Sequence, residues 1–388
     1  METQRLVTLN NEYFSSHPYL KMRIIELCLA RSLGGLELYF EKCCLWFHNS
    51  PHYSVAITLK GSRLDTRLHE FKIPVINFTS GQKSLSLFNA YKLAVLIENH
   101  NIDVLHVHHK NDLITASMSK IFCKKKFLLV HSRQMQIPHS KKDLWHKFIY
   151  RKIDLFITIT EKLRNDTIKR IPLEEDKIVT LYYGVKEPKS FSKENCQDFF
   201  TSGNTETLKV GIFSRFQYLK GQHLVIEAAK ILYDKLKDIE YYLIGDIMDQ
   251  NYYQSLKTSL NDHPLKESFH FREFHPNPLE IMLCFDLILL PSYNETFGLV
   301  LAEAMRSGVA VIGTNYGGVT EIIDHQKTGL LFEKDNARDF AEKIEALILN
   351  KELRKQLAKQ GKAKADQEFN EETHFKKLEN LFIRRLEA

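Results

Sequence analysis

Short runs of apolar and β-branched residues alternate along this chain with longer amphipathic stretches. Buried strands of a parallel sheet read as nearly continuous apolar runs, and the helices between them carry apolar residues every three or four positions. The alternation therefore predicts repeated strand–helix units on parallel sheets. The predicted strands lie at 22–28, 54–59, 73–78, 104–109, 126–132, 155–160, 177–183, 208–214, 241–245, 269–274, 287–292 and 309–314.

The pattern breaks once, in the middle of the chain. Residues 185–207 are polar, contain Pro and Gly, and show no clear period, as linkers do. A chain of 388 residues is also long for one core, so two domains are expected. Helices are predicted at 84–100 and 222–236, and two more close the chain. The predicted parts are an N-terminal domain (1–190), a linker (191–207), a C-terminal domain (208–368) and a C-terminal helix (369–388) that packs back on the N-terminal domain.

Each domain is predicted to be a doubly wound, Rossmann-like α/β sheet, and the two domains to face each other across a cleft. Sheets of this kind bind ligands at the carboxyl ends of their strands. The cleft is therefore where we expect the ligand.

Composition and charge narrow the class of protein. No apolar run reaches 18 residues, and the N-terminus lacks the basic start and apolar stretch of a secretory signal. The six cysteines form no CxxC pair and are interpreted as reduced thiols, which together predicts a cytoplasmic protein.

The charge is unevenly distributed. Residues 1–190 hold 29 Lys and Arg against 18 Asp and Glu, a net charge of +11, whereas the remainder is at −5. The basic half suggests an anionic partner, such as a membrane surface, a phosphorylated acceptor or nucleic acid. Solvated surface lysines are the equally open alternative.

The stretch PSYNETFGLVLAEAMRSG (291–308) carries the most distinctive chemistry. It follows a predicted buried strand, and Gly298 marks the start of a helix whose first free amides, at Leu299 and Val300, form an anion site. Glu295 precedes the helix, and Glu303 shares a helical face with Leu299. Carboxylates beside an anion site fit best if they accept hydrogen bonds from sugar and ribose hydroxyls. The alternative is that Glu295 only favours the start of the helix and that Glu303 is a solvated acid on its surface.

Neighbouring residues favour the ligand interpretation. Arg215 and Lys220 lie on the turn after the strand at 208–214, where two cations can neutralise a diphosphate without metal. Gly317–Gly318 and Gly34–Gly35 each follow a strand, where a backbone without side chains can approach a ligand. The Gly34–Gly35 turn lacks the full GxGxxG pattern and is weak evidence for a dinucleotide site.

Two other segments have competing interpretations. In HVHH (106–109), His106 and His108 share one strand face and His109 points away, which favours buried or strand-end histidines over a metal site; His108 or His109 can also line an acceptor cleft. In HSKKDLWHKFIYRK (139–152), a core role is favoured for one helical face. That face holds Leu144, Trp145, Phe148 and Ile149. The bases Lys141, Lys142, Lys147 and Arg151, with Lys124–Lys126, form a possible surface for anionic lipid or a phosphorylated acceptor.

The assembled motifs closely resemble the retaining glycosyltransferases of family 4, which have the GT-B fold. The resemblance is dense over 208–335 and looser before that. It rests on Arg215 with Lys220–Gly221, Pro291-Ser292, Glu295-x7-Glu303 with Phe297-Gly298, and Gly317-Gly318…Glu321…Thr328-Gly329-Leu330-Leu331.

The resemblance implies roles for residues in the C-terminal half. Glu295 would bind hydroxyls of the donor sugar and Glu303 those of the ribose, while Arg215 and Lys220 would hold the diphosphate and stabilise it as it leaves. Amides of the segment that runs from Phe297 through Gly298 and Leu299 to Val300 would contact sugar and phosphate.

In the N-terminal half, the resemblance implies that Gly35 approaches the diphosphate and His131 touches the donor sugar near the bond that breaks. Arg133 is a candidate for binding an acidic acceptor, and His109 for lining the acceptor site.

The leading hypothesis is thus a retaining glycosyltransferase that uses a UDP- or GDP-sugar, needs no metal or other cofactor, and acts on a cell-envelope glycan or glycolipid such as lipopolysaccharide core. Front-face attack, in which the departing phosphate accepts the proton, is the implied mechanism. No D-x-D pair is present to suggest a metal. A non-catalytic protein of the same fold is the alternative. An NAD enzyme lacks its fingerprint here, and nucleic acid is not an expected partner because no aromatic and basic reading surface is evident.

Overall fold

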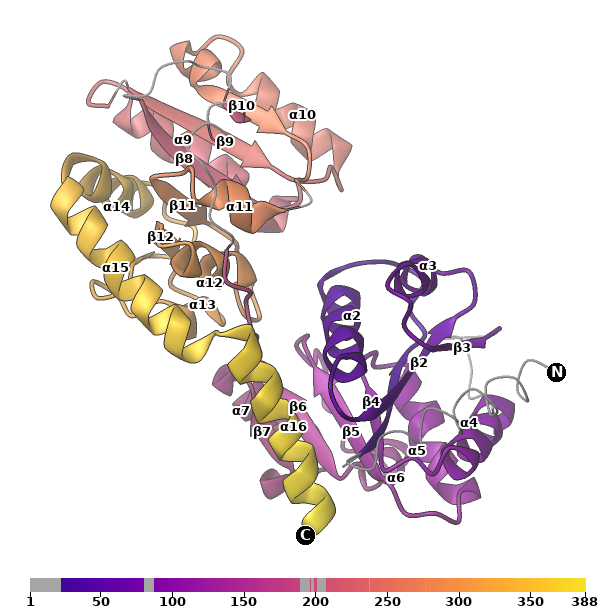
Figure 1. Ribbon diagram of the computed structural model, residues 1–388. Helices are drawn as coiled ribbons and strands as arrows, with labels where there is room; N and C mark the ends of the chain where they lie inside the picture. The colour runs from indigo at the N-terminus through magenta and orange to yellow at the C-terminus, as the bar shows by residue number, and fades with distance from the viewer. Residues whose placement is uncertain are drawn as a thin grey trace. The chain divides into compact units, whose positions relative to one another are not determined.

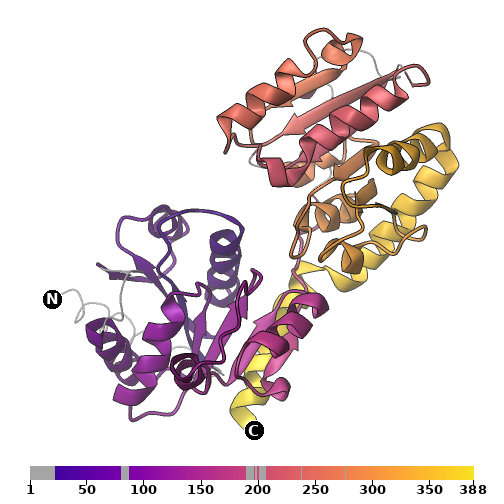
Figure 2. The same cartoon turned by 180° about the vertical axis from the view of Figure 1, so that it is seen from behind.

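The computed structural model describes residues 22–79, 87–188, 196, 199–200, 207–236, 238–275 and 277–388. The chain forms two compact units (Figures 1 and 2). The N-terminal unit comprises the described residues up to Leu181 together with Phe375–Ala388, and the C-terminal unit comprises those of Tyr182–His374. The chain thus leaves the N-terminal unit at Leu181, nine residues before position 190, the predicted end of the N-terminal domain. The N-terminal segment 1–21, most of the predicted linker and the first residues of the predicted 84–100 helix lie outside the described residues.

The N-terminal unit is a seven-stranded parallel sheet with strand order β3-β2-β1-β4-β5-β6-β7. Its strands are β1 (Arg23–Cys28), β2 (Tyr53–Leu59), β3 (Val75–Phe78), β4 (Val104–Val107), β5 (Leu128–Arg133), β6 (Leu155–Thr158) and β7 (Ile178–Thr180). Its helices are α2 (Gly35–His48), α3 (Arg63–Glu70), α4 (Leu87–Asn99), α5 (Asp112–Phe122), α6 (Leu144–Tyr150), α7 (Glu161–Arg170) and the 3-10 turn η1 (Glu175–Lys177).

The C-terminal unit is a six-stranded parallel sheet with order β10-β9-β8-β11-β12-β13. Its strands are β8 (Leu208–Phe213), β9 (Ile239–Ile244), β10 (Phe269–Arg272), β11 (Leu287–Leu290), β12 (Ala310–Thr314) and β13 (Leu330–Phe332). Its helices are η2 (Tyr218–Lys220), α9 (Gln222–Leu232), α10 (Gln250–Thr258), η3 (Pro264–Ser268), α11 (Pro278–Met282), α12 (Leu299–Arg306), α13 (Val319–Ile322), α14 (Ala337–Leu349) and α15 (Lys351–Glu368). The prediction of two doubly wound parallel sheets is confirmed.

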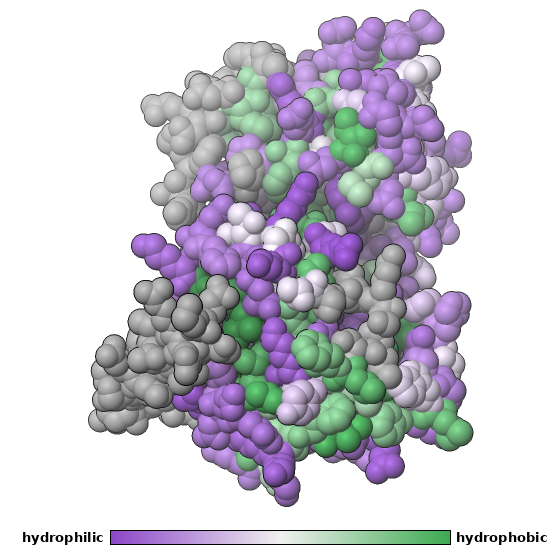
Figure 3. All heavy atoms as spheres, turned by 90° about the vertical axis from the view of Figure 1, so that its right-hand side faces the viewer, coloured by the Kyte–Doolittle hydropathy of each residue, from purple (hydrophilic) through white to green (hydrophobic). Residues whose placement is uncertain are grey.

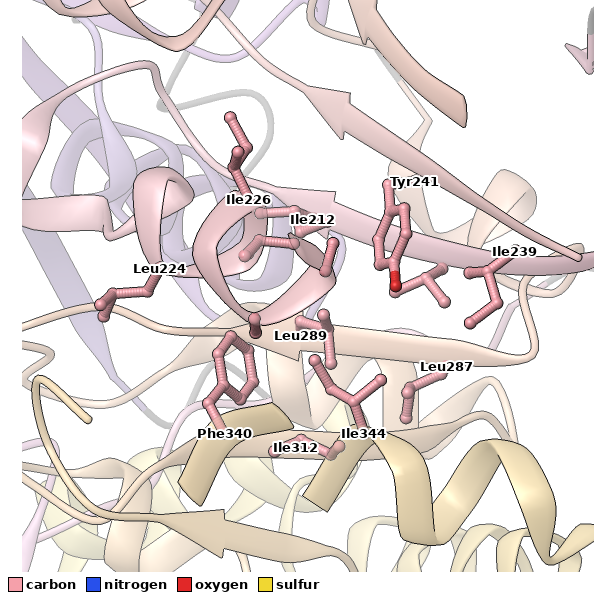
Figure 4. Packing of buried hydrophobic residues seen from close by; sticks show 14 of the residues in the cluster. Ile212, Leu224, Ile226, Ile239, Tyr241, Leu287, Leu289, Ile312, Phe340 and Ile344 are labelled. Atoms are coloured by element: carbon pink, nitrogen blue, oxygen red, sulfur yellow. The ribbon is translucent and has the colours of Figure 1, made fainter. Parts of the chain in front are cut away.

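Each sheet is held by apolar side chains that its helices bury. In the C-terminal unit, Leu289 of β11 and Ile312 of β12 pack with Phe340 and Ile344 of α14 (Figure 4), and all four are fully buried. Burial of one such side chain contributes about 1.5–3 kcal/mol. The continuous apolar runs in the sequence are therefore strands covered on both faces.

Three helices, not the predicted two, follow the last strand. After α14 and α15 the chain continues as α16 (Glu371–Glu387). From Phe375 onward α16 belongs to the N-terminal unit, where Phe382 stacks on Phe47 of α2 with ring centroids 5.8 Å apart. In the same unit, His52 Nε2 lies 3.0 Å from a carboxylate oxygen of Glu379.

Two further expectations from the sequence are wrong. Cys196 and Cys284 form a disulfide with Cα atoms 5.4 Å apart, so the six cysteines are not all thiols. The two cysteines are 88 residues apart in sequence, so the sequence alone does not show that they are close. In the structure, the ring of Phe200 packs on that of Phe285, the residue next to Cys284. The cysteines therefore give no argument for a reducing compartment, and a cytoplasmic location stays a prediction.

The core role expected for one face of α6 is also wrong for three of its four residues. Ile149 is buried, but Leu144, Trp145 and Phe148 are 84%, 45% and 40% exposed. Helical spacing identifies an apolar face but not whether another element covers it.

Candidate active site

Three loops meet at the carboxyl ends of neighbouring strands in the C-terminal unit. The first follows β8 and runs from Arg215 to Gly221, the second follows β11 from Pro291 to Gly298, and the third follows β12. Strand order reverses between β8 and β11, so the first two loops flank the topological switch point, where open α/β sheets bind ligands.

The loops after β8 and β11 are fixed to each other by their backbones. The N–H of Tyr293 donates to the carbonyl of Leu219 at 3.0 Å. Gly221 has a left-handed conformation (φ 71°), and a Cβ there would lie 2.2 Å from the carbonyl oxygen of Pro291. Only glycine combines this conformation with so close an approach.

Side chains that the sequence did not single out add to this connection. His223 of α9 makes hydrogen bonds to the Tyr293 hydroxyl at 3.0 Å and to the Tyr252 hydroxyl at 2.8 Å. Tyr293 also bonds Asp335, and its ring stacks with those of Tyr218 and His223. No spacing rule predicts such contacts, because the residues come from separate elements.

The loop after β12 supports Glu295 from the other side. The N–H of Gly318 donates to the carbonyl of Glu295 at 2.9 Å. A Cβ at Gly317 would lie 2.3 Å from that same carbonyl oxygen, and one at Gly318 would lie 2.1 Å from the Thr296 oxygen. The sequence predicted that a ligand approaches these glycines. In the structure, the backbone of the Glu295 loop occupies the space that their missing side chains leave.

Glu295 and Lys220 form an ion pair, with Nζ 2.5 Å from Oε1. Both side chains are about one-fifth exposed. Arg215 is exposed, and its guanidinium has no partner among the described residues. A partly exposed ion pair contributes only about 0–1 kcal/mol, so a ligand with its own anionic and hydroxyl groups can replace it.

The start of α12 completes the arrangement. Gly298 caps the helix at φ 98°, and the first amides after it, those of Leu299 and Val300, have no intrahelical acceptor. Most of α12 is buried, but Leu299, Val300 and Glu303 are half-exposed. The ring of Phe297 is buried against Tyr183 and Phe369, so that residue offers a ligand only its backbone.

In the N-terminal unit, Gly35 begins α2 and is exposed, with no atom within 4 Å of the place where a Cβ would stand. This leaves room for a ligand beside the backbone. However, the buried carboxylate of Glu37 lies in the same helical turn and would oppose an anion there.

The other N-terminal candidates lie at the ends of β4 and β5. His131 is buried and its Nδ1 bonds the Val107 carbonyl at 3.1 Å; burial holds its pKa well below the usual value. Arg133 donates to the carbonyls of Met135 and Gln136 and thus braces its own loop. Burial, with Lys110 and Arg133 nearby, lowers the pKa of the half-buried His109. The structure thus brings His109 and Arg133 together.

His106 and His108 are buried, as the favoured interpretation predicted, so His108 does not line an open surface. Both bond Glu26 of β1, which the sequence analysis missed because it is a single acid inside an apolar run.

Comparisons with known proteins identify relatives of both halves of the chain. Residues 33–187 match the model for Glycosyltransferase Family 4, and residues 197–364 match the model for Glycosyl transferases group 1. The N-acetyl-alpha-D-glucosaminyl L-malate synthase of Bacillus anthracis is 28% identical over 76% of this chain and 77% of its own length.

Solved structures share the fold. A glycosyltransferase from Rickettsia africae superposes with a TM-score of 0.86 at 21% identity, over 95% of this chain and 99% of its own. The Anabaena protein HepE, solved with UDP and glucose, gives a TM-score of 0.79 at 22% identity, over 93% of this chain and 99% of its own.

We expect Gly317→Ala to cost more stability than Gly308→Ala. Both glycines have φ 71°, so each alanine bears a conformational cost of about 1–2 kcal/mol. Only at Gly317 does the new Cβ also strike the Glu295 carbonyl; at Gly308 the nearest atom is 3.6 Å away. Urea unfolding followed by circular dichroism should show a loss at least about 1 kcal/mol larger for Gly317→Ala.

Both tryptophans, Trp46 and Trp145, lie in the N-terminal unit, so their fluorescence serves as an internal control that neither substitution should change. Equal losses for the two variants would show that the contact with the Glu295 loop carries no energy.

Proposed function

Because this chain is a glycosyltransferase of GT-B architecture, with a family 4 half and a group 1 half, we propose that it moves a sugar from a nucleoside-diphosphate donor to a cell-envelope glycan or glycolipid. It does so with retention of anomeric configuration and without metal in the transfer step. The observation that carries the proposal is the Lys220–Glu295 pair at the switch point of the C-terminal sheet. Arg215 lies in the same loop as Lys220 and has no partner among the described residues.

The donor pyrophosphate is bound by Arg215, Lys220 and the first amides of α12. Two cations and the positive end of a helix supply the charge that a divalent metal supplies in other enzymes. This support for metal-independent transfer comes from two segments of the C-terminal unit, the loop after β8 and the start of α12.

The acids orient the donor. When the pyrophosphate engages Lys220, Glu295 is released to accept hydrogen bonds from sugar hydroxyls, and Glu303 on the open face of α12 accepts those of the ribose. Because Lys220 exchanges Glu295 for the pyrophosphate, phosphate binding and sugar orientation occur together.

In the transfer step, the acceptor hydroxyl oxygen bonds to the anomeric carbon as the bond from that carbon to the phosphate oxygen breaks. The acceptor proton passes to the departing phosphate, so no protein base is needed. The catalytic contribution of Arg215 and Lys220 is to stabilise the negative charge that develops on the diphosphate.

UDP is the proposed nucleotide, with GDP as the alternative, since the similarly folded HepE was solved with UDP. We further propose roles for residues of the N-terminal unit: the Gly35 backbone would approach the diphosphate against the opposing charge of Glu37, His131 would contact the donor sugar, and Arg133 with His109 would bind an acidic acceptor.

The acceptor is proposed to lie at an anionic membrane surface. The described residues contain no helix long and apolar enough to span a bilayer. Yet α6 exposes Leu144, Trp145 and Phe148 beside the exposed bases Lys142 and Lys147. Apolar rings flanked by lysines are the pattern of helices that lie in a membrane interface.

Neighbouring helices expose further apolar rings. The helix α5, which packs against α6, exposes Phe122. The ring centroids of Phe122 and of the exposed Tyr91 of α4 are 6.0 Å apart. Figure 3 shows hydrophobic residues gathered over the lower part of one face, beside hydrophilic ones. The net charge of +11 over residues 1–190 complements anionic lipid.

Lys220→Ala should lower kcat for sugar transfer roughly 100-fold or more, because a charge that stabilises the leaving diphosphate is lost. Lys235→Ala is the matched control, since Lys235 is an exposed, ion-paired lysine of the same unit. Rates are measured with a panel of UDP- and GDP-sugars, with and without brief EDTA treatment, and wild-type activity should survive the chelator. Full activity of Lys220→Ala would rule out the proposed role.

The double variant Leu144→Glu/Trp145→Glu should bind vesicles containing phosphatidylglycerol at least about tenfold more weakly than wild type in sedimentation assays, because charge replaces the apolar contact. Leu349→Glu, at a 67% exposed position of the C-terminal unit, should bind as wild type does. Equal binding by all three proteins would contradict the proposed membrane surface of α6 but would not affect the transferase proposal.

A further inference from the structure

A second polar cluster lies at the switch point of the N-terminal sheet, between β1 and β4. It consists of Glu26 from β1, His106 and His108 from the end of β4, and Cys43 from α2. All four are buried, with exposed fractions of 1% or less. No step of the proposed transfer uses them.

The four side chains present one donor atom each within 4.8 Å of one another. His106 Nδ1 lies 2.9 Å and His108 Nε2 lies 2.6 Å from the same carboxylate oxygen of Glu26. Ligands of a tetrahedral zinc ion stand about 3.3–3.6 Å apart, given bond lengths of about 2.0–2.3 Å. The two His–Glu distances would lengthen by about 0.4–1.0 Å to reach that geometry.

The surroundings have the features of a closed metal site. The other nitrogen of His106, Nε2, is bonded to the Ser132 hydroxyl at 2.8 Å, which fixes the ring as supporting partners of metal ligands do. His108 lacks such a partner: with Nε2 facing Glu26, the Nδ1 atom of this fully buried ring has no hydrogen-bond partner among the described residues. Phe40 packs edge-on against His108, and Phe382 of α16 against His106, so apolar rings cover the cluster.

We propose that Glu26, Cys43, His106 and His108 bind one zinc ion. A thiolate, two imidazoles and a carboxylate form a donor set that suits zinc and not magnesium or calcium, which prefer oxygen. Four protein ligands with no open position make a structural site and not a catalytic one. The competing arrangement is a hydrogen-bonded His–Glu–His network in which Cys43 takes no part.

The ion would join three elements of the N-terminal unit. It would tie α2, whose first residue is Gly35, to β1 and to β4, which leads into His109. Its effect would be to stabilise the unit and position these residues, which is compatible with transfer that needs no metal. The inference rests on geometry separate from that of the Lys220–Glu295 site, so either can fail alone.

The test uses the full chain without a histidine tag, produced in zinc-supplemented medium. Elemental analysis should find about one zinc ion per chain. Exchange for Co²⁺ should produce the visible bands of tetrahedral cobalt and a near-ultraviolet thiolate-to-metal band. Cys43→Ser should abolish the near-ultraviolet band and lower the metal content several-fold.

Cys44→Ser is the matched control, since Cys44 is the equally buried neighbour on α2 and is not a member of the cluster; it should leave both signals unchanged. If Cys43→Ser does not fold, His108→Ala replaces it, with the same expected loss of metal. Wild-type protein that carries no zinc and gives no cobalt bands would overturn the proposal, as would a near-ultraviolet band that survives Cys43→Ser.

Discussion

The candidate active site depends on the close backbone contact between the loops after β8 and β11. These strands are neighbours in the sheet although two strands and their helices separate them in sequence. The left-handed Gly221 against Pro291, and the Tyr293–Leu219 hydrogen bond, bring Lys220 within ion-pair distance of Glu295. Without that contact, a cation and an acid 75 residues apart would be unrelated surface charges.

The two sheets share the strand order 3-2-1-4-5-6 and use their switch points differently. In the C-terminal unit the charged pair is partly exposed and therefore exchangeable, as a binding site requires. In the N-terminal unit the polar groups at the same topological position are sealed by Phe40 and Phe382. A buried carboxylate is stable only when it is paired, which the two histidines, or a metal ion with them, provide. The same topology thus supports an open ligand site in one unit and a closed structural cluster in the other.

The sequence predicted those features that local patterns encode. Apolar runs located the strands, and the position of Glu295 after such a run placed it correctly at a strand end. The strand β13 was missed because its apolar run is only Leu330–Phe332, whereas β7, which also has three residues, lies in a longer run of apolar and β-branched residues. Features that depend on contacts between distant elements were missed, because a local pattern does not say which other element packs against a residue. These features are the Cys196–Cys284 disulfide, the Glu26 cluster and the uncovered face of α6. Helical spacing grouped Trp145 with Ile149, yet only the second faces the sheet.

The most direct test of the central claim is the structure of this protein with a bound nucleoside diphosphate. The account predicts that the pyrophosphate lies about 3 Å from Lys220 Nζ and from the amides of Leu299 and Val300, with Glu295 released from the lysine. A pyrophosphate bound elsewhere, with the Lys220–Glu295 pair still closed, would contradict it.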